Sequence, residues 1–210
     1  MPIFLLSETS CPNINLRNKL ISEIKKHGGK IAYISSIPQD EQKIRFYNTV
    51  SEYQNIDPSI TLEYFDLGEK FSDNDLKKVL EFGIIHMSGG NTFGFLNYIN
   101  KRNFKKILKK HLENNGLIIG VSAGSIILTP NISVCNLPET DENLVGITDL
   151  TALNLVDFEF YPHFTGNKQY LEEIKKYSKT INNPVYVCSD ENGIFIDENK
   201  IEILNNIIKI

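Results

Sequence analysis

A serine between two glycines is the first candidate for chemistry in this chain. Residues 120–124 read Gly-Val-Ser-Ala-Gly and match the G-x-S-x-G pattern of a nucleophile carried on a sharp turn between a strand and a helix. Glycines two positions before and after leave room for such a turn. An apolar run at 117–121 precedes it, and 125–128 can begin a helix. We therefore predict that Ser122 is a nucleophile; the alternative is a structural serine in a tight turn.

A serine hydroxyl needs a base within hydrogen-bond reach to attack near neutral pH. His163 follows Pro162 at the end of a predicted strand, 158–161, and open α/β sheets place their chemistry at such strand ends. We predict His163 as the base. The remaining histidines are less well placed: we expect His27 to be solvated at a helix end, His86 to be packed and hydrogen-bonded within a strand, and His111 to lie on the 102–114 helix.

The acid that would orient the histidine is left open by the residues alone. Three carboxylates, Glu139, Asp141 and Glu142, lie between the serine and His163 in an irregular segment. Further options are Asp157, Asp190 and Glu191.

A second glycine-containing loop could contribute backbone donors. Residues 89–92 read Gly-Gly-Asn-Thr after a predicted strand at 83–87. A glycine pair allows backbone N–H groups to approach a ligand closely. Together with the N–H of Ala123, this loop could form an oxyanion hole. The alternative is a simple strand-to-helix turn capped by Asn91 or Thr92.

The elements that must position these residues alternate between strands and helices. Apolar runs predict strands, and apolar residues at helical spacing predict helices between them. Ser72 and Asp75 form a predicted capping box. This order predicts an α/β fold: one domain over 1–210, a three-layer sandwich with a mostly parallel central sheet. The predicted strands are 3–6, 31–35, 61–65, 83–87, 117–121, 158–161, 185–188, 193–196 and 201–204; the predicted helices include 40–54, 102–114 and 167–180, with a hairpin turn at 197–199.

Composition excludes several classes of protein. The formal net charge is −4, so we expect neither nucleic-acid nor membrane binding. No run is long and apolar enough to span a bilayer, and no signal peptide is recognisable. The three cysteines form no disulfide or zinc pattern, which favours a cytoplasmic location. No metal or cofactor motif occurs, so we predict neither.

Taken together, three motifs resemble the peptidase E (aspartyl dipeptidase) family, which includes cyanophycinases and shares its fold with class I glutamine amidotransferases. They read Gly-Gly-Asn-Thr-Phe at 89–93, Gly-Val-Ser-Ala-Gly-Ser at 120–125 and Tyr-Pro-His-Phe at 161–164. The resemblance covers nearly the whole chain. It implies a serine peptidase without a cofactor that cleaves short peptides, with Ser122 and His163 as catalytic residues. The oxyanion would be held by the N–H groups of Gly90 and Ala123, and the loop residues Gly89, Asn91 and Thr92 would bind substrate.

The chain departs from the family in two places. The stretch 135–139, where aspartyl dipeptidases carry their triad aspartate, reads Cys-Asn-Leu-Pro-Glu. Some relatives use glutamate, so Glu139 is our first candidate acid and Asp141 the second. The family's substrate-binding arginine has no counterpart after the histidine, and Lys168 is a weaker substitute because lysine lacks a bidentate fork. Specificity for an N-terminal aspartate is therefore an open hypothesis.

Other functions remain open at this stage. The same architecture could hydrolyse an ester or another acyl bond, or the chain could be a binding protein that retained the pocket. A glutamine amidotransferase is disfavoured, because those enzymes carry cysteine at the position of Ser122. Related folds often dimerise, so a homodimer is also a hypothesis, although no sequence pattern defines an interface.

Overall fold

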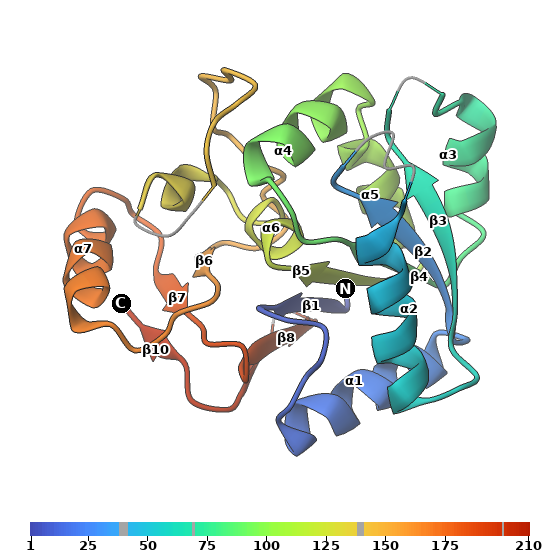
Figure 1. Cartoon of the computed structure of the whole chain (residues 1–210), viewed down its shortest axis with the longest axis horizontal. Coiled ribbons are helices and arrows are strands. Elements are labelled where there is room, and N and C mark those ends of the chain that lie inside the picture. The colour runs from blue at the N-terminus through green and yellow to red at the C-terminus, as the bar shows by residue number, and fades with distance from the viewer. Residues whose placement is uncertain (38–41, 69, 138–140, 199) are drawn as a thin grey trace.

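A seven-stranded sheet forms the centre of the fold (Figure 1). The computed structural model describes residues 1–37, 42–68, 70–137, 141–198 and 200–210. The strand order is β3-β2-β4-β5-β1-β8-β9. The first five strands are parallel, while β8 runs antiparallel to β1 and β9 antiparallel to β8. The strands are β1 (Ile3–Leu6), β2 (Lys30–Ser35), β3 (Thr61–Asp66), β4 (Ile84–Met87), β5 (Leu117–Val121), β8 (Gly193–Asp197) and β9 (Lys200–Leu204).

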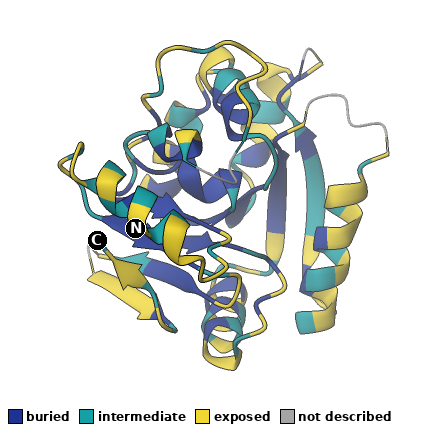
Figure 2. Cartoon of the chain, turned by 60° about the vertical axis from the view of Figure 1, so that its left-hand side comes forward, coloured by how far each residue is buried: buried dark blue, intermediate teal, exposed yellow. Residues whose placement is uncertain are grey.

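Helices cover both faces of this sheet, because alternate side chains of each central strand point to opposite faces. In β1, Phe4 and Leu6 pack with α1 and α2, while Ile3 and Leu5 pack with the helices on the other face. Figure 2 shows the central strands as the most deeply buried part of the chain. The helices are α1 (Ile14–Lys26), α2 (Ile44–Ile56), α3 (Asp73–Val79), α4 (Thr92–Lys101), α5 (Lys105–Glu113), α6 (Ala123–Ile126) and α7 (Lys168–Ser178).

A second, smaller sheet lies beside the first. It has the order β10-β7-β6 and comprises β6 (Glu159–Tyr161), β7 (Val185–Val187) and β10 (Ile208–Lys209). The expectation that His163 follows a strand of an open parallel sheet is therefore inexact. The histidine follows β6, a strand of this small sheet, whose apolar residues join the main core.

The predicted α/β sandwich with a mostly parallel sheet is confirmed. The capping box of Ser72 and Asp75 is also present at the start of α3. A separate helix, α4, begins directly after Asn91, as the alternative interpretation of residues 89–92 predicted, although its extent was not given from the sequence. The predicted hairpin turn joins β8 and β9, although Asn199 lies outside the described residues. No helix in the described part of the chain is long and apolar enough to cross a bilayer.

Candidate active site

Ser122 occupies a strained turn at the carboxyl end of β5. Its backbone angles are φ 51° and ψ −114°, a sparsely populated combination for a residue with a side chain, and such strain often marks functional sites. The turn is held by a 2.9 Å hydrogen bond from the N–H of Ser122 to the carbonyl of Leu6. Gly124 must lack a side chain, because a Cβ there would lie 2.0 Å from the carbonyl oxygen of Met87.

His163 contacts this serine directly. Its Nε2 lies 2.9 Å from the Oγ of Ser122, within hydrogen-bond reach. The histidine has a positive φ of 58°, and its backbone N–H donates to the Oγ of Ser7 at 2.7 Å. The imidazole is therefore aimed at the serine by the backbone that follows β6 and by the end of β1.

The carboxylate at the other imidazole nitrogen belongs to Asp190. Its Oδ1 lies 2.6 Å from Nδ1 of His163 and also accepts a 3.0 Å hydrogen bond from the hydroxyl of Ser7. Both the histidine and the aspartate are exposed, so water can reach them. Ser122, His163 and Asp190 thus have the connectivity of a nucleophile, a base and an orienting acid.

Of the three acids favoured on sequence grounds, the structure describes two, and neither is hydrogen-bonded to His163. Glu139 is outside the described residues. The second candidate, Asp141, instead accepts hydrogen bonds from the backbone N–H and the hydroxyl of Thr92. Glu142 is exposed, and its backbone carbonyl accepts a bond from the side chain of Asn91. We therefore assign the acid position to Asp190.

The predicted backbone donors lie beside the serine. A Cβ on Gly89 would be 3.3 Å from Cβ of Ser122, which places the 89–90 loop against the nucleophile. Gly90 has a φ of 141°, and a Cβ there would lie 2.1 Å from Oγ of Ser36. Within the described part of the chain, the N–H groups of Gly90 and Ala123 donate no other hydrogen bond. Both are available to an oxyanion.

The remaining predicted substrate residues have local partners or lie away from the serine. Asn91 caps α4 by accepting a bond from the N–H of Gly94 at 2.8 Å. Thr92 is fully buried and bonded to Asp141. Lys168 is exposed at the start of α7 and does not line the cavity beside Ser122.

A cavity of about 250 Å³ opens beside Ser122 and His163. One wall is the face of α2 formed by residues at positions i, i+3, i+4 and i+7, which a helix places on one side. The other walls come from the loop after β1 and from β2 and β4. The charged and polar lining residues are Glu8, Thr9, Tyr33, Arg45, Asn48, Thr49, Glu52 and His86.

Two ionisable groups in this cavity are strongly affected by their surroundings. Burial lowers the pKa of His86 to about 3, so its imidazole is neutral at physiological pH. Burial, reinforced by the negative charge of Glu8, raises the pKa of the Glu52 carboxyl, while a hydrogen bond from Thr9 opposes the rise.

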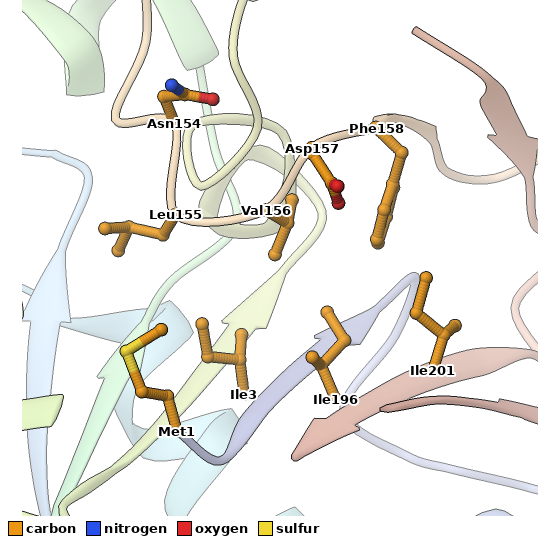
Figure 3. A pocket seen from close by; sticks show the side chains of 9 residues that line it. All are labelled: Met1, Ile3, Asn154, Leu155, Val156, Asp157, Phe158, Ile196 and Ile201. Carbon is orange, nitrogen blue, oxygen red and sulfur yellow. The ribbon is translucent and has the colours of Figure 1, made fainter. Parts of the chain in front are cut away.

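A larger cavity, about 370 Å³, lies at the opposite end of β1 (Figure 3). Its lining is mainly apolar, with Met1, Ile3 and Ile196 on the sheet side and Val156 and Phe158 facing them. Among the described residues that line it, Asp157 carries the charged side chain. Without a nucleophile or a base, it is not the candidate active site.

One group of side chains in the described part of the chain has the types and spacing of metal ligands: Glu8, His163 and Asp190, whose ligand atoms lie within 4.8 Å of one another. Two of these residues already share a hydrogen bond. Exposed acidic groups near a histidine are common without an ion, and we assign no metal here.

Several residues of the site were not singled out by the sequence. Ser7 and Glu8 follow β1 directly, and the strand's position next to β5 brings them to the serine. Arg45 and Glu52 lie seven residues apart on the polar face of α2. The sequence shows this helical spacing once the apolar residues of the opposite face are recognised. Asp190 was one of several candidate acids, and only the tertiary contact distinguishes it.

Comparisons with known proteins show which family the sequence belongs to. Residues 3–204 match the sequence profile of peptidase family S51. The chain is 27% identical over 160 residues to an uncharacterized peptidase of Pasteurella multocida, covering 74% of this chain and 76% of the relative. It is also 26% identical over 200 residues to a peptidase E of Nostoc sp., a match that covers 88% of this chain and 77% of the relative.

Solved structures give the same fold. A candidate peptidase E protein from Listeria monocytogenes EGD-e superposes with a TM-score of 0.75 at 23% identity, covering 98% of each chain. A peptidase from an acI-B1 Actinobacterium superposes with a TM-score of 0.66 at 11% identity, covering 98% of this chain and 87% of the other. The predicted glutamine amidotransferase-like fold is confirmed by these neighbours.

Proposed function

Because the chain belongs to peptidase family S51, a family of serine peptidases, we propose that it hydrolyses short peptides with Ser122 as its nucleophile. The observation that carries this proposal is the continuous hydrogen-bonded series from Ser122 to His163 to Asp190, at 2.9 and 2.6 Å. In this proposal Asp190 takes the role for which the sequence first suggested Glu139.

The proposed reaction has two steps. His163 Nε2 takes the hydroxyl proton while Oγ of Ser122 attacks the peptide carbonyl carbon, and the resulting oxyanion accepts hydrogen bonds from the N–H groups of Gly90 and Ala123. The carbon–nitrogen bond then breaks, the leaving amine takes the proton from His163, and an acyl-enzyme remains. Water gives a proton to His163 and attacks the acyl carbon. The bond from this carbon to Oγ of Ser122 then breaks, His163 returns the proton to Oγ, and the acid is released. Asp190 holds the imidazole in the required orientation and stabilises its cationic form.

The size of the cavity supports dipeptides or similarly short substrates. Dipeptides with an N-terminal aspartate are one group to test, because Arg45 supplies a cation in the cavity, although it lies on α2 rather than after the histidine. An arginine can hold a carboxylate through two parallel hydrogen bonds. Lys168, away from the cavity, has no part in this proposal.

The first experiment is labelling with a fluorophosphonate probe, comparing the wild type with Ser122→Ala. We expect labelling of the wild type and none of the variant.

A dipeptide panel follows, with Asp-Xaa set against neutral and basic N-terminal residues, in the wild type and in Arg45→Gln. A folded wild-type protein that is not labelled would contradict the proposal and favour a binding protein. Labelling together with hydrolysis of esters alone would instead indicate a different acyl substrate.

A further inference from the structure

The peptide unit between Gly89 and Gly90 carries the N–H group that would hold the oxyanion. Its carbonyl oxygen, on Gly89, accepts a 2.6 Å hydrogen bond from the hydroxyl of Ser36. Ser36 is 5% exposed and directly follows β2. Within the described part of the chain, this is the one hydrogen bond that the peptide unit makes. A single buried hydroxyl thus contacts the peptide unit on the side opposite the proposed oxyanion donor.

A peptide unit between two glycines can rotate as a whole, because neither neighbour has a side chain that restricts it. Gly90 has a φ of 141°, in a region that residues with side chains rarely adopt. Rotation of the unit by half a turn would exchange the directions of its C=O and N–H groups. Local sterics therefore do not decide which of the two groups faces Ser122, and a contact from elsewhere in the fold must do so.

The backbone on both sides of this peptide unit is anchored. Before it, the N–H of Ser88 donates to a carbonyl of β2 at 3.1 Å, and the hydroxyl of Ser88 accepts the N–H of Ser36 at 2.8 Å. After it, the N–H of Thr92 donates to a carboxylate oxygen of Asp141 at 2.6 Å. The freedom that remains in this loop is therefore concentrated in the peptide unit between the two glycines.

We propose that Ser36 is a positioning residue: its hydroxyl holds the carbonyl of Gly89 away from the nucleophile, so that the N–H of Gly90 points to the place where the oxyanion develops. This inference rests on the proposed function. The peptide bond is trans, and in a trans peptide the C=O and N–H groups point in opposite directions. A hydrogen bond that fixes the carbonyl therefore fixes the N–H group as well.

The same hydrogen bond should strengthen the donor that it orients. A carbonyl that accepts a hydrogen bond draws electron density from its amide nitrogen, and the N–H group becomes a better donor, as in a cooperative chain of hydrogen bonds. This gain is largest when negative charge develops on the substrate oxygen. Ser36 should therefore affect the chemical steps more than the binding of substrate.

The test follows an acetyl group on Ser122, so it needs no known peptide substrate. The probe is p-nitrophenyl acetate, isotopically labelled at its carbonyl carbon, which acetylates an activated serine and releases nitrophenol. Mass spectrometry gives the rates of acetylation and deacetylation of Ser122. Infrared spectroscopy gives the stretching frequency of the acetyl carbonyl, which hydrogen bonds to its oxygen lower. Since the net contribution of one hydrogen bond corresponds to about five- to tenfold, we expect Ser36→Ala to slow both rates by about that factor and to raise the carbonyl frequency.

A matched control is Ser35→Ala. Ser35 is 7% exposed, and its hydroxyl donates to the carbonyl of Ile37 at 2.9 Å instead, so this variant should keep the wild-type rates and frequency. Wild-type rates and frequency in a folded Ser36→Ala protein, or equal changes in the two variants, would overturn the positioning role while leaving the serine hydrolase intact. Absence of acetylation of Ser122 in the wild type, with Ser122→Ala as the blank, would instead overturn the proposed function, and the role of Ser36 with it.

Discussion

The hydroxyl of Ser7 lies 3.0 Å from Oδ1 of Asp190, and the same hydroxyl accepts the backbone N–H of His163 at 2.7 Å. Ser7 directly follows β1, the neighbour of β5 in the sheet. One buried side chain therefore fixes both the carboxylate and the backbone of the histidine relative to the strand that carries Ser122.

Replacing Ser7 with alanine should remove one hydrogen bond that positions the carboxylate of Asp190, while leaving the carboxylate itself in place. The variant loses a hydrogen bond to a carboxylate, which contributes about 1.5 kcal/mol, so we expect kcat/KM to fall about tenfold with the fold unchanged. The check is steady-state kinetics on the best dipeptide, with far-UV circular dichroism as the control. Unchanged kinetics in a folded protein would show that Asp190 is positioned without Ser7.

The variant Asp190→Asn tests which acid serves His163. It keeps the shape of the side chain but removes its charge and can select the wrong imidazole tautomer, an effect worth about 10⁴ in kcat in a serine protease triad. We expect a loss of about 10³-fold or more, measured as kcat/KM. The neighbouring exposed Glu191→Gln should retain activity. Full activity in Asp190→Asn combined with a loss in Glu139→Gln would return the acid role to Glu139.

Gly90→Ala should damage the oxyanion site. The added Cβ would meet Oγ of Ser36 at 2.1 Å, and the residue would have to keep a φ of 141° that disfavours side chains. The N–H would therefore turn away, and losing one such donor costs about 10² to 10³ in kcat.

The control lies four residues further on. Gly94 is in α4, where a Cβ would be 3.4 Å from Oδ1 of Asn91, close to ordinary contact. Gly94→Ala should keep activity and raise the free energy of unfolding by about 0.5–1 kcal/mol through helix propensity. Equal kcat values for the two alanine variants would argue against Gly90 as an oxyanion donor.

His86 should make the protein less stable in mild acid. Its folded pKa is about 3 against an ordinary value of 6.5, so the unfolded chain takes up the proton first. The stability it contributes is complete above about pH 6.5 and is lost as the pH falls toward 3. Between about pH 7 and pH 5 the loss from this group is about 2 kcal/mol.

The variant His86→Gln isolates this effect, since glutamine can still accept the hydrogen bond from the hydroxyl of Tyr53. The free energy of unfolding of each protein is measured by urea denaturation at each pH. The difference between wild type and variant should change by about 2 kcal/mol between about pH 7 and pH 5. Parallel curves for the two proteins would mean that His86 is not buried as a neutral side chain.

The local part of the site was determined by the sequence. The glycines around Ser122, the apolar strand before it and the short helix after it all lie within a dozen residues, so local sterics define the turn. The same holds for the capping box of α3 and for most strands, because their apolar runs must be buried on both faces. The bounds of α4 (Thr92–Lys101) were not predicted, since residues 92–101 and 105–113 form nearly continuous helical patterns, and β10 (Ile208–Lys209) was missed because it has only two residues.

The acid and the cavity were decided by tertiary structure. Asp190 lies 27 residues after His163 in sequence, and Ser7 lies 156 residues before it. Nothing in a carboxylate's immediate neighbours distinguishes it from others on the surface; only the pairing of β1 with β5, and of β7 with β6, brings these turns together. Likewise, Glu8 and Glu52 come from separate elements, the loop after β1 and α2, and only the fold brings both to the cavity that Ser122 also lines.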